Sequence, residues 1–139
     1  MADTPHPAPR VRPLSPHIGI YRWPITMATS IAHRVTGGGL AAGTVLLCWW
    51  LVAVASGPQP FNTFVALAAT PLGQLVLFGF TWALCYHLLN GIRHLAWDLG
   101  YGFAVPTANR TGILVVVSSV LLAVIAFGLA YSGHGGYYQ

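Results

Sequence analysis

Between Arg34 and Arg93 the sequence carries no aspartate, glutamate, lysine or arginine, and long apolar runs fill most of this interval. Over the whole chain 55% of residues are hydrophobic and only 6% are charged, and the mean hydropathy is +0.66. A soluble domain carries roughly 25% charged residues, so this chain cannot cover a water-facing surface. Because about 20 apolar residues are enough to cross a bilayer, the sequence predicts a single all-α membrane domain.

Residues that break helices divide the apolar sequence into three predicted transmembrane helices. Thr70 is a suitable N-cap for the second helix, because Pro71 follows it at the first helical position. The stretch 59–69 is amphipathic, and we expect it to form a short helix at the membrane interface. The predicted spans are residues 26–55, 71–99 and 111–131, within a membrane domain that covers residues 25–131.

The arginines predict the direction in which these helices cross. The sequence has six arginines and no lysine, and the arginines lie before or at the start of the first span or beside the loop between the second and third. Cytoplasmic segments of membrane proteins are enriched in arginine and lysine, so we expect a cytoplasmic N-terminus and a periplasmic C-terminus. Residues 1–24 lack the apolar region of a cleaved signal peptide and should form an extended cytoplasmic arm. Residues 132–139 should form a short outer tail.

Several other functions are not supported by the sequence. The net charge of +4 does not indicate nucleic-acid binding, because the arginines do not cluster as a basic face. Cys48 and Cys85 lie outside any CxxC or CxxCH motif, so neither structural zinc nor covalently attached haem is predicted. The chain also has no dinucleotide fingerprint and no cysteine cluster for an iron–sulfur centre.

Polar residues gather at the start of the first span. Ser30, His33, Arg34 and Gly37 are spaced so that they share one helix face. An arginine at the membrane interface is commonly an anchor whose charged end reaches water. A guanidinium with a hydroxyl and an imidazole within one turn could instead hold an anion or a carbonyl oxygen. The spacing leaves both interpretations open.

The second span ends in another polar group, in the stretch YHLLNGIRHLAWD over residues 86–98. His87 and His94 are seven residues apart, which places them on one face about 10 Å apart along the axis. Asp98 lies close to the same stripe, and this end of the helix should meet the polar start of the first span. An imidazole inside a span is costly, and beside a small residue such as Gly91 it suits b-type haem iron. The alternative is an imidazole satisfied by a hydroxyl or carbonyl of a neighbouring helix.

These two regions carry a family resemblance. The stretches RPLSPHIGIYRWPITMATSIAHRVTG and HLLNGIRHLAWDLG resemble the two signatures of the cytochrome b556 subunits of succinate dehydrogenase. That family is the larger membrane anchor of respiratory complex II, and the resemblance spans residues 12–131. It implies half of a haem-binding helical bundle in the bacterial inner membrane, which passes electrons derived from succinate to ubiquinone.

The resemblance also implies a haem b site. His87 matches the axial ligand of the haem iron, whose second ligand is a histidine of the small anchor subunit. His33, Arg34 and His94 match residues that surround the haem propionates.

The resemblance further implies a ubiquinone site. Ser30 and Arg34 match residues that line this site, and Asp98 matches an acid close to it. The implied partners are the small anchor subunit, the iron–sulfur subunit, the flavoprotein subunit and membrane lipids, and the chain alone is not an enzyme. Two alternatives remain at this point: the anchor of a quinol:fumarate reductase, and a cofactor-free structural or transporter subunit.

Overall fold

The computed structural model describes residue 17 and residues 19–134 of the chain. Three of its helices are long and apolar enough to cross a membrane, and the described residues form no strand, so the predicted all-α membrane fold is confirmed. Residues 1–16, 18 and 135–139 include most of the predicted arm and tail and lie outside the described residues. The helices, in chain order, are α1 (Ile25–Ala55), α2 (Pro58–Ala68), α3 (Pro71–Asp98) and α4 (Val105–His134).

Glycine and proline residues set the limits of the first three helices. Gly57 joins α1 to α2 with a φ of +105°, a conformation that favours glycine because it has no side chain. Thr70 caps α3: its hydroxyl oxygen accepts a hydrogen bond from the Gly73 N–H at 3.1 Å, and Pro71 is the first helical residue. The short helix α2 occupies the stretch for which the sequence indicated an interfacial helix.

The fourth helix begins earlier than the sequence analysis suggested, at Val105 rather than at residue 111. Pro106 lies in its first turn, where a missing N–H costs nothing. The Ala108 N–H already donates to the Ala104 carbonyl at 2.9 Å, which closes this turn. Residues 109–111 are polar and resemble a loop, but they lie inside the helix.

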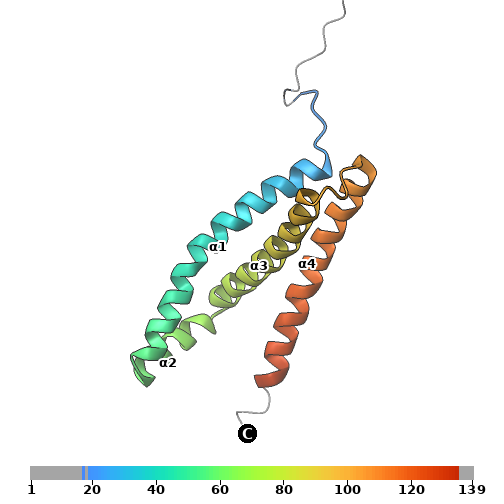
Figure 1. Cartoon of the computed structure of the whole chain (residues 1–139). Coiled ribbons are helices and arrows are strands. Elements are labelled where there is room, and N and C mark those ends of the chain that lie inside the picture. Colours follow the sequence, from blue (N-terminus) through green and yellow to red (C-terminus); the bar gives the residue numbers. More distant parts are fainter. Residues whose placement is uncertain (1–16, 18, 135–139) are drawn as a thin grey trace, which may run out of the picture.

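Helix α3 packs against both α1 and α4, while α2 lies at the opposite end of α1 from its N-terminus (Figure 1). Two glycines allow α1 to approach α3 and α4 closely. A Cβ atom at Gly43 of α1 would collide with the Phe80 ring of α3. A Cβ atom at Gly112 of α4 would lie 2.9 Å from Cγ2 of Ile25 on α1.

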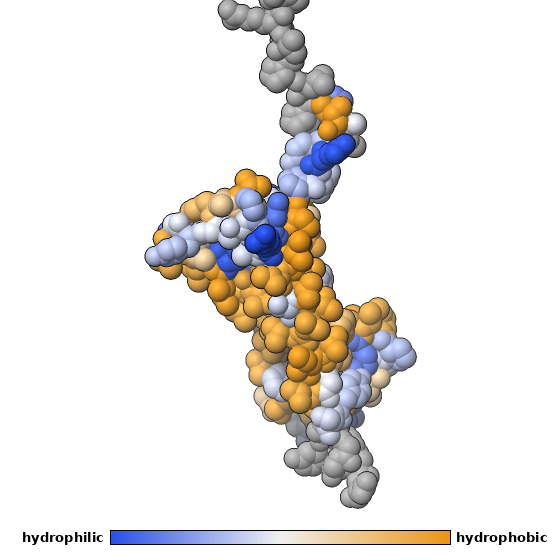
Figure 2. Space-filling model, turned by 90° about the vertical axis from the view of Figure 1, so that its right-hand side faces the viewer, coloured by the Kyte–Doolittle hydropathy of each residue, from blue (hydrophilic) through white to orange (hydrophobic). Residues whose placement is uncertain are grey.

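Most apolar side chains remain on the outside of this bundle. Figure 2 shows an apolar band across the middle of one face, with hydrophilic residues gathered above and below it. A bilayer would cover such a band. Several of the buried side chains are polar or aromatic instead, among them Thr29, Tyr86, Asn90 and Arg93.

Candidate functional site

Four of the buried polar residues, Thr29, Thr36, Asn90 and Arg93, lie toward one end of the bundle, which we call the polar end, whereas Ser119 is buried midway along α4. The polar end comprises the first turns of α1, the last turns of α3 and the first turns of α4, near the point where the N-terminal segment enters α1 (Figure 1). The second polar stretch of the sequence therefore meets the first, and the start of α4 lies beside them.

Three imidazole rings form a stack at the polar end. The ring of His33 on α1 lies against that of His87 on α3, with centroids 3.8 Å apart and planes inclined by 11°. The same ring faces His94 at 5.1 Å and 16°. His87 and His94 thus lie on the side of α3 that faces α1. We call these residues the histidine stack.

The hydroxyl of Thr36 lies beside His87. Its Oγ1 is 2.8 Å from the Ala32 carbonyl oxygen and 3.0 Å from that of His33, and it is 3.4 Å from His87 Nδ1. A carbonyl only accepts, so the single hydroxyl hydrogen points to a carbonyl and the oxygen is left to accept from His87. This arrangement favours the imidazole tautomer with hydrogen on Nδ1, which leaves a lone pair on Nε2.

Gly37 provides the space that the His87 ring occupies. A Cβ atom there would lie 3.1 Å from His87 Cε1, closer than such contacts normally are. The neighbouring Gly38 meets nothing within 4 Å of the same ideal position. A side chain at residue 37 would therefore crowd the His87 ring, whereas one at residue 38 would not.

His94 is held from within its own helix. Its Nδ1 lies 2.8 Å from the Asn90 carbonyl oxygen and therefore donates to it. Its ring also contacts Trp97, with centroids 5.0 Å apart. In contrast, the buried Nδ1 of His33 has no hydrogen-bond partner within the described part of the chain. The stack thus contains one satisfied imidazole and one with an unused polar atom.

The other predicted site residues lie nearer the surface. Ser30 is half-buried, and Arg34 and Asp98 are exposed. The hydroxyl of Ser30 makes no side-chain hydrogen bond among residues 19–134, and no ion pair there joins Arg34 to Asp98. These three groups lie at the polar end and are free to contact another molecule.

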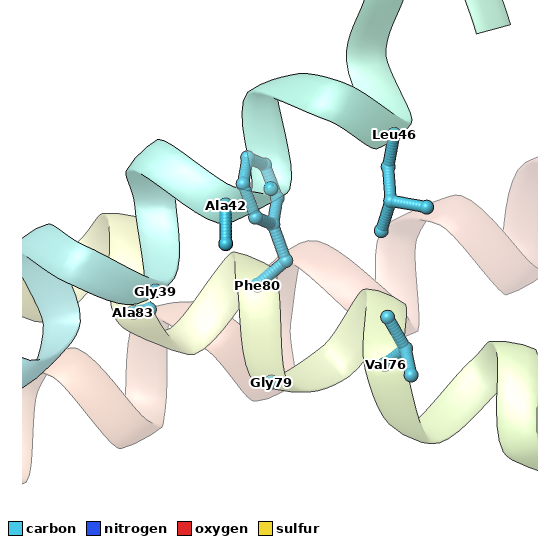
Figure 3. Close-up of a pocket in the computed structure, with 8 residues that line it drawn as sticks. Gly39, Ala42, Leu46, Val76, Gly79, Phe80 and Ala83 are labelled. Atoms are coloured by element: carbon cyan, nitrogen blue, oxygen red, sulfur yellow. The ribbon is translucent and has the colours of Figure 1, made fainter. Parts of the chain in front are cut away.

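An apolar crevice of about 290 Å³ lies between α1 and α3 (Figure 3). A Cβ atom at Gly39 or Gly79 would meet nothing within 4 Å, so these glycines widen the gap. Figure 3 shows the Phe80 ring pointing toward α1 beside Ala42. Ala83 lies one turn before His87, which places the crevice next to the histidine stack. Its lining residues are Gly39, Ala42, Gly43, Leu46, Val76, Gly79, Phe80 and Ala83.

Arg93 is a further candidate that the sequence analysis used only as a marker of topology. It is buried on α3 and forms hydrogen bonds to side chains or carbonyls of α1, α3 and α4. Its spacing from Tyr86 and Asn90, which places all three on one face of α3, was the available signal. Its partners on the other helices could not be identified from spacing.

Comparison with known proteins gives a consistent family. Residues 9–126 match the model of the succinate dehydrogenase/fumarate reductase transmembrane subunit. The chain is 46% identical over 114 residues to the succinate dehydrogenase cytochrome b556 subunit of Paracoccus denitrificans, covering 82% of this chain and 88% of the relative. The corresponding Rickettsia prowazekii subunit is 43% identical, with coverage of 82% and 89%. The mitochondrial cytochrome b560 subunit of Sus scrofa is 44% identical over 118 residues, covering 81% of this chain and 68% of the relative.

Proposed function

The chain belongs to the succinate dehydrogenase/fumarate reductase transmembrane subunit family, and from this membership we propose that it binds haem b and forms part of a ubiquinone-reduction site. The resemblance of its two signature stretches to this family is thereby confirmed. With its three apolar helices, family membership makes the chain a multi-pass protein of the bacterial inner membrane. It is a membrane anchor of complex II, and the flavoprotein and iron–sulfur subunits are its implied partners.

The haem proposal rests on the surroundings of His87. Thr36 accepts from its Nδ1, so that Nε2 has a lone pair available for iron, and Gly37 leaves room for the ring. His87 would therefore hold the haem iron through Nε2, while His33 is stacked against its ring. As the family resemblance implies, we propose that a histidine of the small anchor subunit would supply the other ligand to the iron. When bound, haem supplies one-electron redox chemistry at its iron.

The remaining polar groups of the stack suit the edge of a haem. The unpartnered Nδ1 of His33 is a buried polar atom that an acceptor or donor could satisfy. Arg34, one residue further on, offers a cation. We propose that both, together with His94, contact the haem propionates. The apolar crevice of small residues beside the stack supports a flat, apolar group at this place.

The ubiquinone proposal rests on the free groups at the surface of the polar end. Ser30 and Arg34 are one turn apart on α1, and both can donate hydrogen bonds to quinone carbonyl oxygens. The quinone gains negative charge as it is reduced, and fixed donors stabilise that charge. Asp98 is exposed at the end of α3 and can pass on a proton from solvent. The arginine asymmetry favours a cytoplasmic position for this end, where the iron–sulfur subunit would dock.

The direction of electron flow is not a property of this chain. The family description names succinate dehydrogenase and fumarate reductase together, whereas the relatives named above are succinate dehydrogenase subunits. The quinone potential decides the direction in the cell. We propose succinate oxidation as the physiological reaction.

Purification of the tagged chain from its native membranes tests the proposal. We expect the flavoprotein and iron–sulfur subunits to co-purify, together with a small hydrophobic chain and a b-type spectrum that dithionite reduces. The preparation should reduce a soluble ubiquinone analogue with succinate as donor. An assembled complex without b-type absorption would overturn the haem assignment, and one without quinone reductase activity would overturn the quinone assignment.

A further inference from the structure

Arg93 is an unusual residue for the interior of a membrane helix. Its side chain is 6% exposed, although an arginine within a span is expensive and is normally retained for a function. A guanidinium has five N–H donors in one plane and accepts no hydrogen bond. The partners that these donors find therefore show what the residue does.

The guanidinium of Arg93 links three helices. Toward α4, Nε donates to Thr111 Oγ1 at 3.0 Å and Nη2 donates to the Ala108 carbonyl at 2.7 Å. Toward α1, Nη1 donates to Thr29 Oγ1 at 3.3 Å. On its own helix, Nη1 also donates to Asn90 Oδ1 at 3.3 Å. We call these five residues the Arg93 cluster.

All of these hydrogen-bond acceptors are neutral. No carboxylate pairs with Arg93 among the residues that the structure describes, and the aromatic ring of Trp97 lies 4.1 Å from the guanidinium carbon. The arrangement uses the planar shape of the group as well as its charge. A lysine, with a single ammonium, could not reach three helices in the same way.

One branch of the Arg93 cluster leads to the proposed quinone residues. Thr29 directly precedes Ser30 and lies one turn before His33. Its backbone is held as well, because the Tyr86 hydroxyl donates to the Thr29 carbonyl at 2.8 Å. The first turns of α1 are therefore fastened to α3 at Thr29, through both the side chain and the main chain.

The other branch of the Arg93 cluster leads to the histidine stack. Because Arg93 only donates, the acceptor on the Asn90 side chain is Oδ1, which lies 3.3 Å from Nη1. The backbone carbonyl of the same asparagine accepts from His94 Nδ1. Asn90 thus binds the guanidinium through its side chain and the imidazole through its backbone carbonyl.

We propose that Arg93 is a positioning residue for the quinone and haem groups: it sets the register of Ser30 and His33 on α1 against His94 on α3. This inference rests on the proposed function, and it predicts that loss of the α1 branch disturbs electron transfer to quinone even in a complex that assembles. Loss of an α4 contact should affect stability without this disturbance.

Threonine-to-valine variants separate the two branches, because valine keeps the shape and removes the hydroxyl. In purified complex, Thr29→Val and Arg93→Lys should lower kcat/KM for a soluble ubiquinone analogue by about 10- to 100-fold, since small misplacements at a reacting site have effects of that size. Both variants should also shift the electron paramagnetic resonance signal of the low-spin haem. Thr111→Val should retain wild-type kcat/KM and haem signal. Thr29→Val decides the question even where Arg93→Lys does not assemble.

A distance measurement gives a readout that does not depend on activity. Spin labels at Val35→Cys and Leu95→Cys, two exposed positions on α1 and α3, report the register of the helices when Cys48 and Cys85 are replaced by serine. We expect Thr29→Val to broaden the distance distribution between them. An unchanged distribution, or a broadened one with wild-type kcat/KM and haem signal, would overturn the proposal. A wild-type complex without haem or quinone reductase activity would instead show that the proposed function itself had failed.

Discussion

The imidazole of His33 stacks on that of His87, so that a residue near the start of α1 contacts the proposed haem ligand in the second half of α3. The two rings are nearly parallel, at 11°, and a third ring, that of His94, continues the stack. This contact brings the two polar stretches of the sequence into one site. It also determines which variants best test the site.

Replacing the proposed haem ligand should remove haem. We expect His87→Ala to abolish or strongly shift the dithionite-reduced b-type bands of the purified complex, because Nε2 of this ring is the available ligand. His94 shares its face of α3, so the double variant His87→Ala with His94→Ala excludes rescue by that ring. His94→Ala alone should keep low-spin haem. An unchanged spectrum in the double variant would show that this chain supplies no axial ligand.

The glycine beside His87 offers a finer test. Gly37→Ala adds a carbon 3.1 Å from His87 Cε1, so the ring must move, and haem occupancy or its absorption maximum should change. Gly38→Ala is the matched control, because its new carbon would meet nothing within 4 Å. Alanine is favoured over glycine in a helix by up to about 1 kcal/mol, so the stability of the Gly38→Ala control should not decrease. Identical haem spectra for the two variants would contradict the assigned role of Gly37.

Removing the proposed quinone donors should lower the rate of quinone reduction. We expect Arg34→Leu to reduce succinate–quinone reductase activity by roughly 10² to 10³, the typical effect of losing one donor at a well-formed anionic transition state. Ser30→Ala should act in the same direction and more mildly, because water can replace a hydroxyl.

Two controls distinguish quinone chemistry from assembly in these variants. Succinate oxidation by a dye that accepts electrons upstream should persist, and Arg110→Leu, which removes another exposed arginine, should keep normal activity. Full haem content with wild-type quinone reductase rates in both site variants would mean that Ser30 and Arg34 serve only as anchors.

Reporter fusions test the proposed orientation. An alkaline phosphatase fused after Gln139 should be active, since the arginine asymmetry predicts a periplasmic C-terminus. The same enzyme inserted between α3 and α4, at Tyr101, should be inactive, because this loop should be cytoplasmic. The reverse pattern would move the polar end away from the side where the iron–sulfur subunit would dock.

The sequence predicts the helices well because proline, glycine and a threonine cap mark their limits directly. The start of α4 was harder to predict, since the polar residues 109–111 resemble a loop. The helical hydrogen bond from the Ala108 N–H to the Ala104 carbonyl cannot be recognised from the composition of this stretch. The seven-residue spacing of His87 and His94 predicted a shared face. The stacking of the His33 ring on both of them depends on how α1 packs on α3, and residue spacing within one helix does not predict that packing.

The role of Arg93 could not be predicted for a related reason. Two of its acceptors are threonine hydroxyls and one is the main-chain carbonyl of Ala108, groups that occur throughout any membrane helix. They become partners of Arg93 only after α1, α3 and α4 have packed together. Thr29 and Arg93 are 64 residues apart in the sequence, yet their side chains are hydrogen-bonded in the folded chain.

The small amount of mutual burial among the spans has a cellular consequence. Only 11% of the most apolar window of α1 and 17% of that of α3 are buried within the chain. In lipid, helices gain no hydrophobic advantage from leaving the acyl chains, so an orphan copy of this chain has little to hold its helices together beyond the polar end. Cells that synthesise it in excess over the other subunits should therefore present it to membrane proteases as a substrate. Its abundance would then follow that of the scarcest subunit rather than its own transcript.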